Sequence, residues 1–155
     1  MKNKLFYLSI QAFIYLIPIT ANAIDIKLQC DVVSKITYIS GETEEQRGLA
    51  LIEINDYGNK KYLFVSSALD SLNNLTFTTQ SPRFITNDFS NENKWDIEQV
   101  GTETSTILSS IARIIIDRNS GTLLVSRDVT FTSRKSMQFA TSGNCKKINT
   151  SVKKF

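Results

Sequence analysis

Residues 107–132 have the sequence ILSSIARIIID-RNSG-TLLVSRDVTFT, and this stretch decides the fold class. Its first part, Ile107–Asp117, is rich in the β-branched residues that strands favour. Residues 118–121 form a turn sequence, because Gly accepts a positive φ while Asn and Ser bond their own backbone. Residues 122–132 then return as a second β-rich run. The sequence therefore predicts an antiparallel β-hairpin.

The same strand pattern extends from this hairpin towards both ends of the chain. Between residues 26 and 32, apolar and polar residues alternate with the period of a half-buried strand. Further strands are expected at 36–39, 47–54, 60–66, 75–79, 94–100 and 137–145. Turns or loops are expected at 41–46, 56–59 and 133–136, and at most one helical turn after Ser67. Residues 80–93 contain Pro82 and many Ser, Asn and Asp, so we expect an irregular loop there.

The chain has 155 residues, which is the size of a single domain. It shows no sustained helical period and no internal repeat. We therefore predict an all-β fold, an antiparallel meander of about eight strands that forms a closed or partly open barrel. A two-sheet sandwich is the alternative. This single domain is expected to comprise residues 24–155.

The first 23 residues have the organisation of a cleaved signal peptide. Lys2 and Lys4 provide a positive start, and residues 5–17 form an apolar run interrupted only by Ser and Gln. Residues 21–23 are Ala-Asn-Ala, a signal-peptidase site that predicts cleavage before Ile24. A membrane anchor is the alternative, but thirteen helical residues span only about 20 Å of a hydrocarbon core of about 30 Å. We expect an exported protein, periplasmic or secreted.

Two cysteines, Cys30 and Cys145, lie near the two ends of the mature chain. In an oxidising compartment, an even pair predicts a disulfide. A metal site would need more Cys or a His, and a catalytic thiol would need a base, so both alternatives are disfavoured. The bridge would bring the first and last strands together, which favours the barrel over the sandwich.

Composition excludes several classes of function. The chain has 18 basic and 15 acidic residues, and Lys2 and Lys4 lie in the predicted leader, so the mature net charge is +1. This balance gives no basic stripe for nucleic acid. The absence of His excludes Ser-His-Asp triads, Cys-His pairs and HExxH zinc sites. We expect no cofactor, no metal and no membrane span.

The order of residues 114–121, IIIDRNSG, followed by a returning strand and Gly143-Asn144-Cys145, resembles many small uncharacterised exported bacterial β-proteins. This resemblance implies a secreted β-domain, and it brings no known activity or binding residues. Gln29-Cys30-Asp31 together with the closing Cys is also similar to the small barrel inhibitors of lysozyme. The early Gly-x-Trp of the lipocalin family is missing, since Trp95 lies in mid-chain.

Asp96 and Glu98 are the first candidate pair for chemistry. They lie on one face of the strand that contains Trp95, and paired carboxylates can act as acid and base on a glycoside. The favoured interpretation is different. A strand that buries Trp95 and Ile97 on one face must show polar residues to water on the other.

Arg113 and Asp117 are the second pair, and they share one face of the strand at 107–117. With Trp95, they form the predicted ligand-binding set, because an Arg paired with an acid can hold an anionic ligand. The favoured alternative places them on the solvent face, with Ala112, Ile114 and Ile116 pointing inward.

Two charge clusters are interpreted as solvated surface. Glu42, Glu44 and Glu45 lack the D-x-D-x-D-G order of a calcium loop. The C-terminal lysines of residues 146–154 are typical of a solvated chain end.

We therefore predict a non-enzymatic module of the cell envelope or medium that binds a small apolar ligand in the barrel or an envelope protein. The alternatives are a carboxylate-dependent hydrolase and a small protein inhibitor of an envelope hydrolase. A ligand-sized space inside the barrel would favour binding, whereas a cleft with carboxylates about 5–9 Å apart would favour hydrolysis. The oligomeric state stays open.

Overall fold

The computed structural model describes residues 24–101 and 104–148, and the regular elements of these residues are all β-strands. The strands are β1 (Ile24–Thr37), β2 (Thr43–Asp56), β3 (Lys61–Ser67), β4 (Leu75–Thr78), β5 (Phe84–Asp88), β6 (Lys94–Gly101), β7 (Ile107–Asp117), β8 (Thr122–Phe131) and β9 (Ser136–Lys147). The predicted all-β class is confirmed. The predicted leader lies outside the described residues, among which there is no helix that could cross a membrane.

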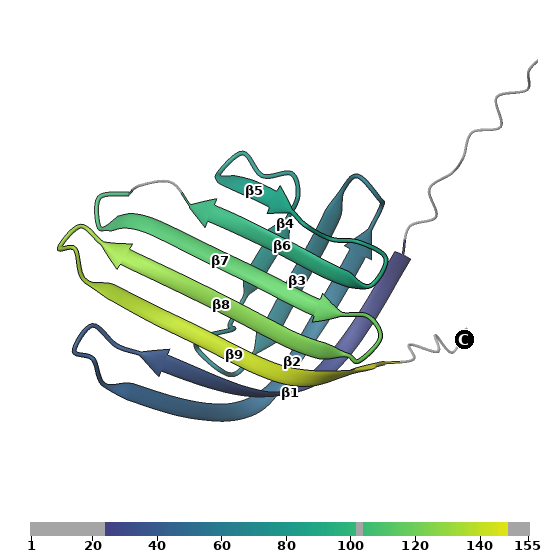
Figure 1. The fold of residues 1–155 in the computed structure, drawn as a ribbon, viewed down its shortest axis with the longest axis horizontal. Coiled ribbons are helices and arrows are strands. Elements are labelled where there is room, and N and C mark those ends of the chain that lie inside the picture. Colours follow the sequence, from purple (N-terminus) through teal and green to yellow (C-terminus); the bar gives the residue numbers. More distant parts are fainter. Residues whose placement is uncertain (1–23, 102–103, 149–155) are drawn as a thin grey trace, which may run out of the picture.

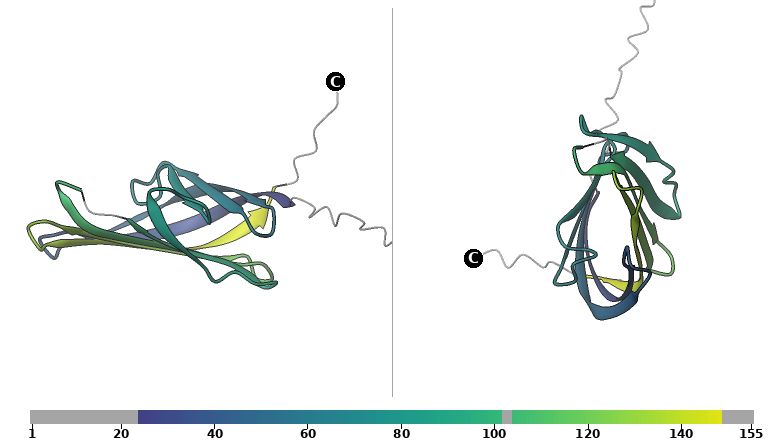
Figure 2. Two further views of the ribbon diagram at one scale, coloured as in Figure 1. Left: turned by 90° about the horizontal axis from the view of Figure 1, so that it is seen from above. Right: turned by 90° about the vertical axis from the view of Figure 1, so that its left-hand side faces the viewer.

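All nine strands form one antiparallel sheet in the order β4-β3-β2-β1-β9-β8-β7-β6-β5 (Figure 1). The first and last strands pair in the middle of the sheet, and its two edges, β4 and β5, follow each other in the chain. Figure 2 shows the result as a flattened barrel, with β1–β4 in one wall and β6–β9 in the other. Because β4 and β5 do not pair, the barrel has one unsealed seam between them.

The contact between β1 and β9 carries the disulfide. Cys30 and Cys145 are direct partners in the register, and their Cα atoms lie 3.9 Å apart. The predicted bridge is therefore confirmed, as is the meeting of the first and last strands. Gly143 allows this close approach, since a Cβ there would lie 2.5 Å from the carbonyl oxygen of Asp31.

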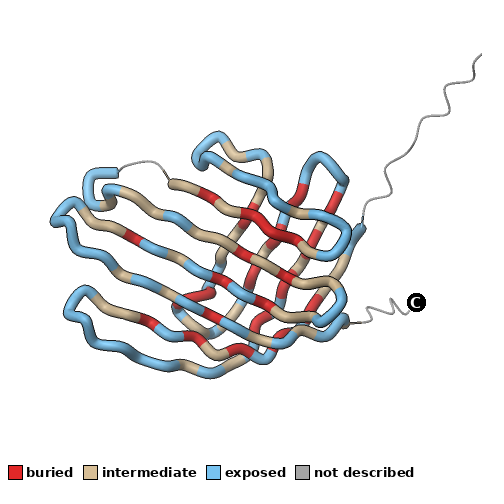
Figure 3. Tube along the Cα trace, viewed as in Figure 1, coloured by how far each residue is buried: buried red, intermediate tan, exposed pale blue. Residues whose placement is uncertain are grey.

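The hydrophobic core lies between the two walls and consists of alternate residues of the strands. Six of its fully buried members are Ile52, Ile54, Leu63, Val65, Ile97 and Ile114. Each such side chain contributes about 1.5–3 kcal/mol by leaving water. Figure 3 shows the buried positions gathered at one end of the barrel, while the hairpin tips at the other end are mostly exposed.

Three strand boundaries differ from the predicted ones. Residues 84–88, expected to be irregular, form β5 because they pair with β6 from Phe84↔Gly101 to Asp88↔Ile97. The predicted break after Val32 is absent, because β1 pairs with β2 along its whole length. The same pairing extends β2 back to Thr43, into the predicted acidic loop. Backbone pairing with a neighbouring strand thus overrides a polar local sequence in each case.

Candidate functional site

Two neighbouring rows of inward-facing residues differ in size, and the difference creates a cavity. The first row, on β6, β7 and β8, is buried and branched: Ile97, Ile114 and Val125. Two residues further along, the register places Gln99, Ala112 and Arg127 side by side. Ala112 is much smaller than the Ile in the row before. A cavity of about 310 Å³ opens beside it.

This cavity lies at the unsealed seam. Phe77 of β4 and Phe84 of β5 line its apolar side, opposite Ala112 and Arg127. The Nε2 atom of Gln99 donates a hydrogen bond to the carbonyl oxygen of Thr78 (3.0 Å). This bond links β6 to the edge strand β4, although these two strands do not pair through their backbones. We call the hollow the seam cavity, and its lining is Asn73, Asn74, Leu75, Thr76, Phe77, Phe84, Gln99, Gly101, Ser110, Ala112 and Arg127.

Arg127 brings a positive charge to the seam cavity. It alternates on β8 in phase with the buried Leu123, Val125 and Val129, so its side chain enters the barrel. The guanidinium carbon lies 5.8 Å from the ring centroid of Phe139 on β9. Arg127 forms no salt bridge with an acidic residue in the part of the chain that the structure describes. Arg127 is half-buried and has no acidic partner among the described residues, so its guanidinium is available to an anionic ligand group.

A second cavity, of about 390 Å³, lies at the end of the barrel beside the disulfide. Trp95 and Asp117, two of the three predicted ligand-binding residues, both line it. The Nε1 atom of Trp95 donates a hydrogen bond to Asp56 Oδ2 (3.1 Å), and Arg118 lies over its ring at 4.1 Å. Trp95 is only 4% exposed. These contacts make it a structural link between β2, β6 and the β7–β8 turn.

The carboxylate of Asp117 is hydrogen-bonded within the β7–β8 turn. Its Oδ1 atom accepts hydrogen bonds from the backbone N–H groups of Ser120 (2.7 Å) and Asn119 (2.9 Å). The hydrogen bond from Ser120, followed by that from Asn119, lowers the pKa of Asp117. Arg113 lies on the outer face of the sheet, opposite to the buried Trp95 and four residues along β7 from Asp117, and it pairs with Asp96 there. The structure therefore does not bring the predicted set of Trp95, Arg113 and Asp117 together.

The predicted solvent exposure of Asp96 is wrong. Its exposed fraction is 0%, although it faces outward from β6, because the segment after β5 folds over it. The backbone N–H of Asp96 donates to Ser90 Oγ (3.0 Å), and the N–H of Phe89 donates to the carbonyl oxygen of Asp96 (2.8 Å). Arg113 reaches the carboxylate with Nε (2.8 Å) and Nη2 (2.9 Å), and Lys94 Nζ lies 2.6 Å from Oδ2.

This pairing determines what Asp96 can do chemically. The Arg113 guanidinium lowers the pKa of Asp96 against burial, which raises it, and Lys94 lowers it further. Asp96 therefore stays ionised with both oxygens bound to cations. Glu98 accepts a separate hydrogen bond from Asn87 (3.0 Å). The two carboxylates do not face each other across a cleft. In contrast, the expected inward positions of Ile114 and Ile116 are confirmed.

Sequence reasoning missed Arg127, although a signal was present. On the strand at 122–132, Arg127 occupies the same alternate positions as the apolar residues, whereas Ser126 and Asp128 occupy the polar ones. A charged residue at an apolar position of an alternating strand is therefore the signal that identifies Arg127 as unusual. Its cavity was not predictable, because that space depends on Ala112 of another strand and on two aromatic residues across the seam.

No protein-family model and no curated protein matches this chain. The resemblances to exported β-proteins and to lysozyme inhibitors therefore remain predictions. Among the described residues, no group of three or more His, Cys, Asp or Glu is placed to hold a metal ion.

Proposed function

We propose that the protein is a non-enzymatic binding module that holds a small amphipathic anion in the seam cavity. The apolar part of the ligand lies against Phe77 and Phe84, and its acidic group bonds to Arg127. The observation that carries this proposal is an inward-facing guanidinium, without an acidic partner among the described residues, beside a cavity of about 310 Å³. Small-molecule pockets begin at about 300 Å³, so the space suits a small ligand.

The predicted leader and the disulfide support a place of action outside the cytoplasm, in the periplasm or the medium. Disulfides persist in oxidising compartments, and the Cys30–Cys145 bridge joins the two central strands of the barrel. Binding at the seam fits this architecture. The seam is the gap between the edge strands β4 and β5, which do not pair with each other. A ligand can therefore enter there without breaking a strand ladder.

The test uses two probes with the same apolar chain, octanoate and 1-octanol, titrated into the mature protein and followed by two-dimensional NMR. A charge-assisted hydrogen bond contributes about 1.5–3 kcal/mol, so octanoate should bind at least about tenfold more tightly than octanol. The largest chemical-shift changes should occur at the Gln99 side-chain amide and at Ala112, which line the cavity.

Arg127→Met should remove the preference for octanoate while leaving octanol binding nearly unchanged. Arg134→Met is the matched control, since Arg134 is exposed in the β8–β9 turn. Equal affinity of the wild-type protein for both probes, or shifts confined to other surfaces, would contradict the proposal.

A further inference from the structure

Gln99 gives the seam cavity a second hydrogen-bonding group besides Arg127. The side chain of Gln99 is 5% exposed and lines the cavity. Its Nε2 atom donates to the carbonyl oxygen of Thr78 (3.0 Å). Because a carbonyl oxygen can only accept, this bond fixes the orientation of the amide group. The other branch of the amide is therefore the acceptor atom Oε1.

The Oε1 atom of Gln99 accepts no hydrogen bond from the residues that the structure describes. An amide oxygen can accept two hydrogen bonds, and a buried side chain that leaves them unmade loses the bonds it had with water. Native proteins complete the bonds of most buried polar groups. The cavity is therefore suited to a ligand that supplies an N–H or O–H donor to this oxygen.

The register determines how far apart the two polar groups lie. Gln99, Ala112 and Arg127 form one row across β6, β7 and β8, with the small Ala112 in the middle. Neighbouring strands lie about 4.8 Å apart, so the backbones at Gln99 and Arg127 are separated by about 10 Å. Phe77 and Phe84 line the same cavity. The cavity thus has an apolar middle between two polar groups.

The two polar groups require opposite partners. The guanidinium of Arg127 can only donate hydrogen bonds, and Arg127 is the one charged residue among the described residues that line the cavity. The Oε1 atom of Gln99 can only accept. A ligand that satisfies both carries one acidic group and, at a distance from it, a neutral donor. A second acidic group would find no second cation among these lining residues.

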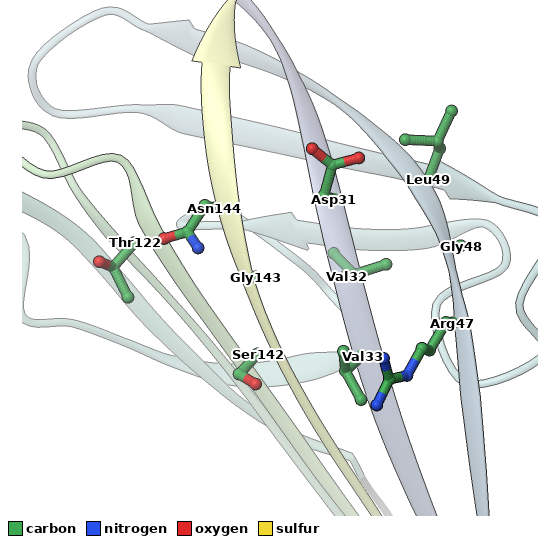
Figure 4. A pocket seen from close by; sticks show the side chains of 10 residues that line it. All are labelled: Asp31, Val32, Val33, Arg47, Gly48, Leu49, Thr122, Ser142, Gly143 and Asn144. Atoms are coloured by element: carbon green, nitrogen blue, oxygen red, sulfur yellow. The ribbon is translucent and has the colours of Figure 1, made fainter.

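A larger hollow, of about 730 Å³, lies on the outer face of the sheet over β1, β2 and β9 (Figure 4). Its polar lining residues are exposed or half-buried, and they include Asp31, Arg47 and Asn144. Exposed polar groups are bonded to water, so they specify no particular ligand. The buried acceptor of Gln99 distinguishes the seam cavity from this hollow.

We propose that the ligand of the seam cavity is a medium-chain acid that carries a hydroxyl or N–H group at the end opposite to its acidic group. The acidic group bonds to Arg127, the apolar chain crosses Ala112, and the distal donor bonds to Oε1 of Gln99. This ligand class rests on the proposed function, because it requires the acidic group to bind at Arg127. It adds the second polar end and the length between the two ends.

The experiment compares octanoate, 8-hydroxyoctanoate and 8-methoxyoctanoate by isothermal titration calorimetry with the mature protein. The extended chain of these probes is about as long as two strand spacings. The methyl ether keeps the distal oxygen but cannot donate. One additional hydrogen bond should make 8-hydroxyoctanoate bind about fivefold more tightly than either other probe. Without an acceptor in the cavity, the hydroxyl would lose its bonds to water and weaken binding relative to octanoate.

Gln99→Met keeps a side chain of similar length and removes the acceptor. It should abolish the preference for 8-hydroxyoctanoate over 8-methoxyoctanoate, while octanoate binds with nearly the wild-type Kd. Gln138→Met is the matched control, since Gln138 is exposed on β9, and it should keep the preference. The comparison of probes uses the wild-type protein, so it decides the question even if Gln99→Met does not fold.

The outcomes separate this ligand class from the proposed function. Failure of all three probes to bind would overturn both. If octanoate binds in a manner that depends on Arg127, but 8-hydroxyoctanoate binds no more tightly, the proposed function stands and the distal donor is wrong. A preference for the hydroxyl that persists in Gln99→Met would also overturn the assignment to Gln99.

Discussion

At the scale of single residues, Asp96 balances two cations, and its removal leaves Arg113 and Lys94 without their partner. Breaking a buried ion pair costs about 3–5 kcal/mol, and the partial exposure of the two cations reduces this cost. We expect Asp96→Ala to lower the free energy of unfolding by about 2–3 kcal/mol. Glu98→Ala, on the same face of β6, should change it by no more than about 0.5 kcal/mol. Urea unfolding followed by Trp95 fluorescence measures both, and equal losses would contradict the assignment.

The ionisation of Asp96 also makes stability depend on pH. The Arg113 guanidinium lowers its pKa against the raising effect of burial, and Lys94 lowers it further. A carboxyl whose pKa is lower in the folded state stabilises the protein above its unfolded pKa of about 3.9, and this stability is lost as the pH falls through the folded pKa. The stability difference between the wild-type protein and Asp96→Asn should therefore shrink below about pH 4. A difference that stays constant in urea titrations down to about pH 2 would count against this ionic role.

The alternation of apolar and polar residues correctly predicted which residues of a strand point into the core. Trp95, Ile114 and Ile116 are buried as expected. Periodicity failed for Asp96, because a segment that follows another strand covers the outer face at this position. Whether an outward residue meets water depends on such tertiary contacts, which no local pattern contains.

At the scale of strands, Gly143 and Gly48 flank Val32 on β9 and β2, and only one of them has to be Gly. A Cβ at Gly143 would lie 2.5 Å from the backbone oxygen of Asp31, so β9 must move away from β1. At Gly48, the nearest atom, at 3.1 Å, belongs to the Leu69 side chain, which can rotate.

We therefore expect Gly143→Ala to lower the free energy of unfolding by about 1–3 kcal/mol, the usual cost of forcing extra atoms into a packed site. Gly48→Ala should change it by less than about 1 kcal/mol. Chemical denaturation of the two variants provides the measurement. A larger loss for Gly48→Ala than for Gly143→Ala would contradict the tighter packing at Gly143.

Strands could be predicted where apolar and polar residues alternate, as at residues 26–32, or where β-branched residues are concentrated, as in β7. The edge strand β5 could not, because Phe84–Asp88 lies within a Ser- and Asn-rich segment and becomes a strand by pairing with β6. The seam cavity belongs to the same class of feature. It arises where β4 and β5 lie beside β7 and β8, which are distant from them in sequence.

At the scale of the whole molecule, the first and last strands pair in the middle of the sheet. The unsealed seam therefore lies between β4 and β5, two strands from the middle of the chain. The cysteine pair predicted that the first and last strands meet, but not that the sheet keeps two edges elsewhere. Side chains hold these edges together. Lys61 forms a salt bridge to Asp88 (2.6 Å) from β3 to β5, and Gln99 binds the carbonyl oxygen of Thr78. Such contacts depend on pairs far apart in sequence.

The disulfide joins the two central strands, so its loss tests how the barrel is held closed. Its sequence separation of 115 residues predicts a stabilisation of about 4–5 kcal/mol from the restricted unfolded chain. We expect the double variant Cys30→Ser, Cys145→Ser to melt roughly 10–15 °C lower in calorimetry. Its far-UV circular dichroism should stay that of a β-protein, because β1 and β9 remain paired from Leu28↔Lys147 to Thr37↔Gln138. An unchanged Tm would mean that this ladder alone supplies the closure, and free thiols in protein purified from an oxidising compartment would contradict the bridge itself.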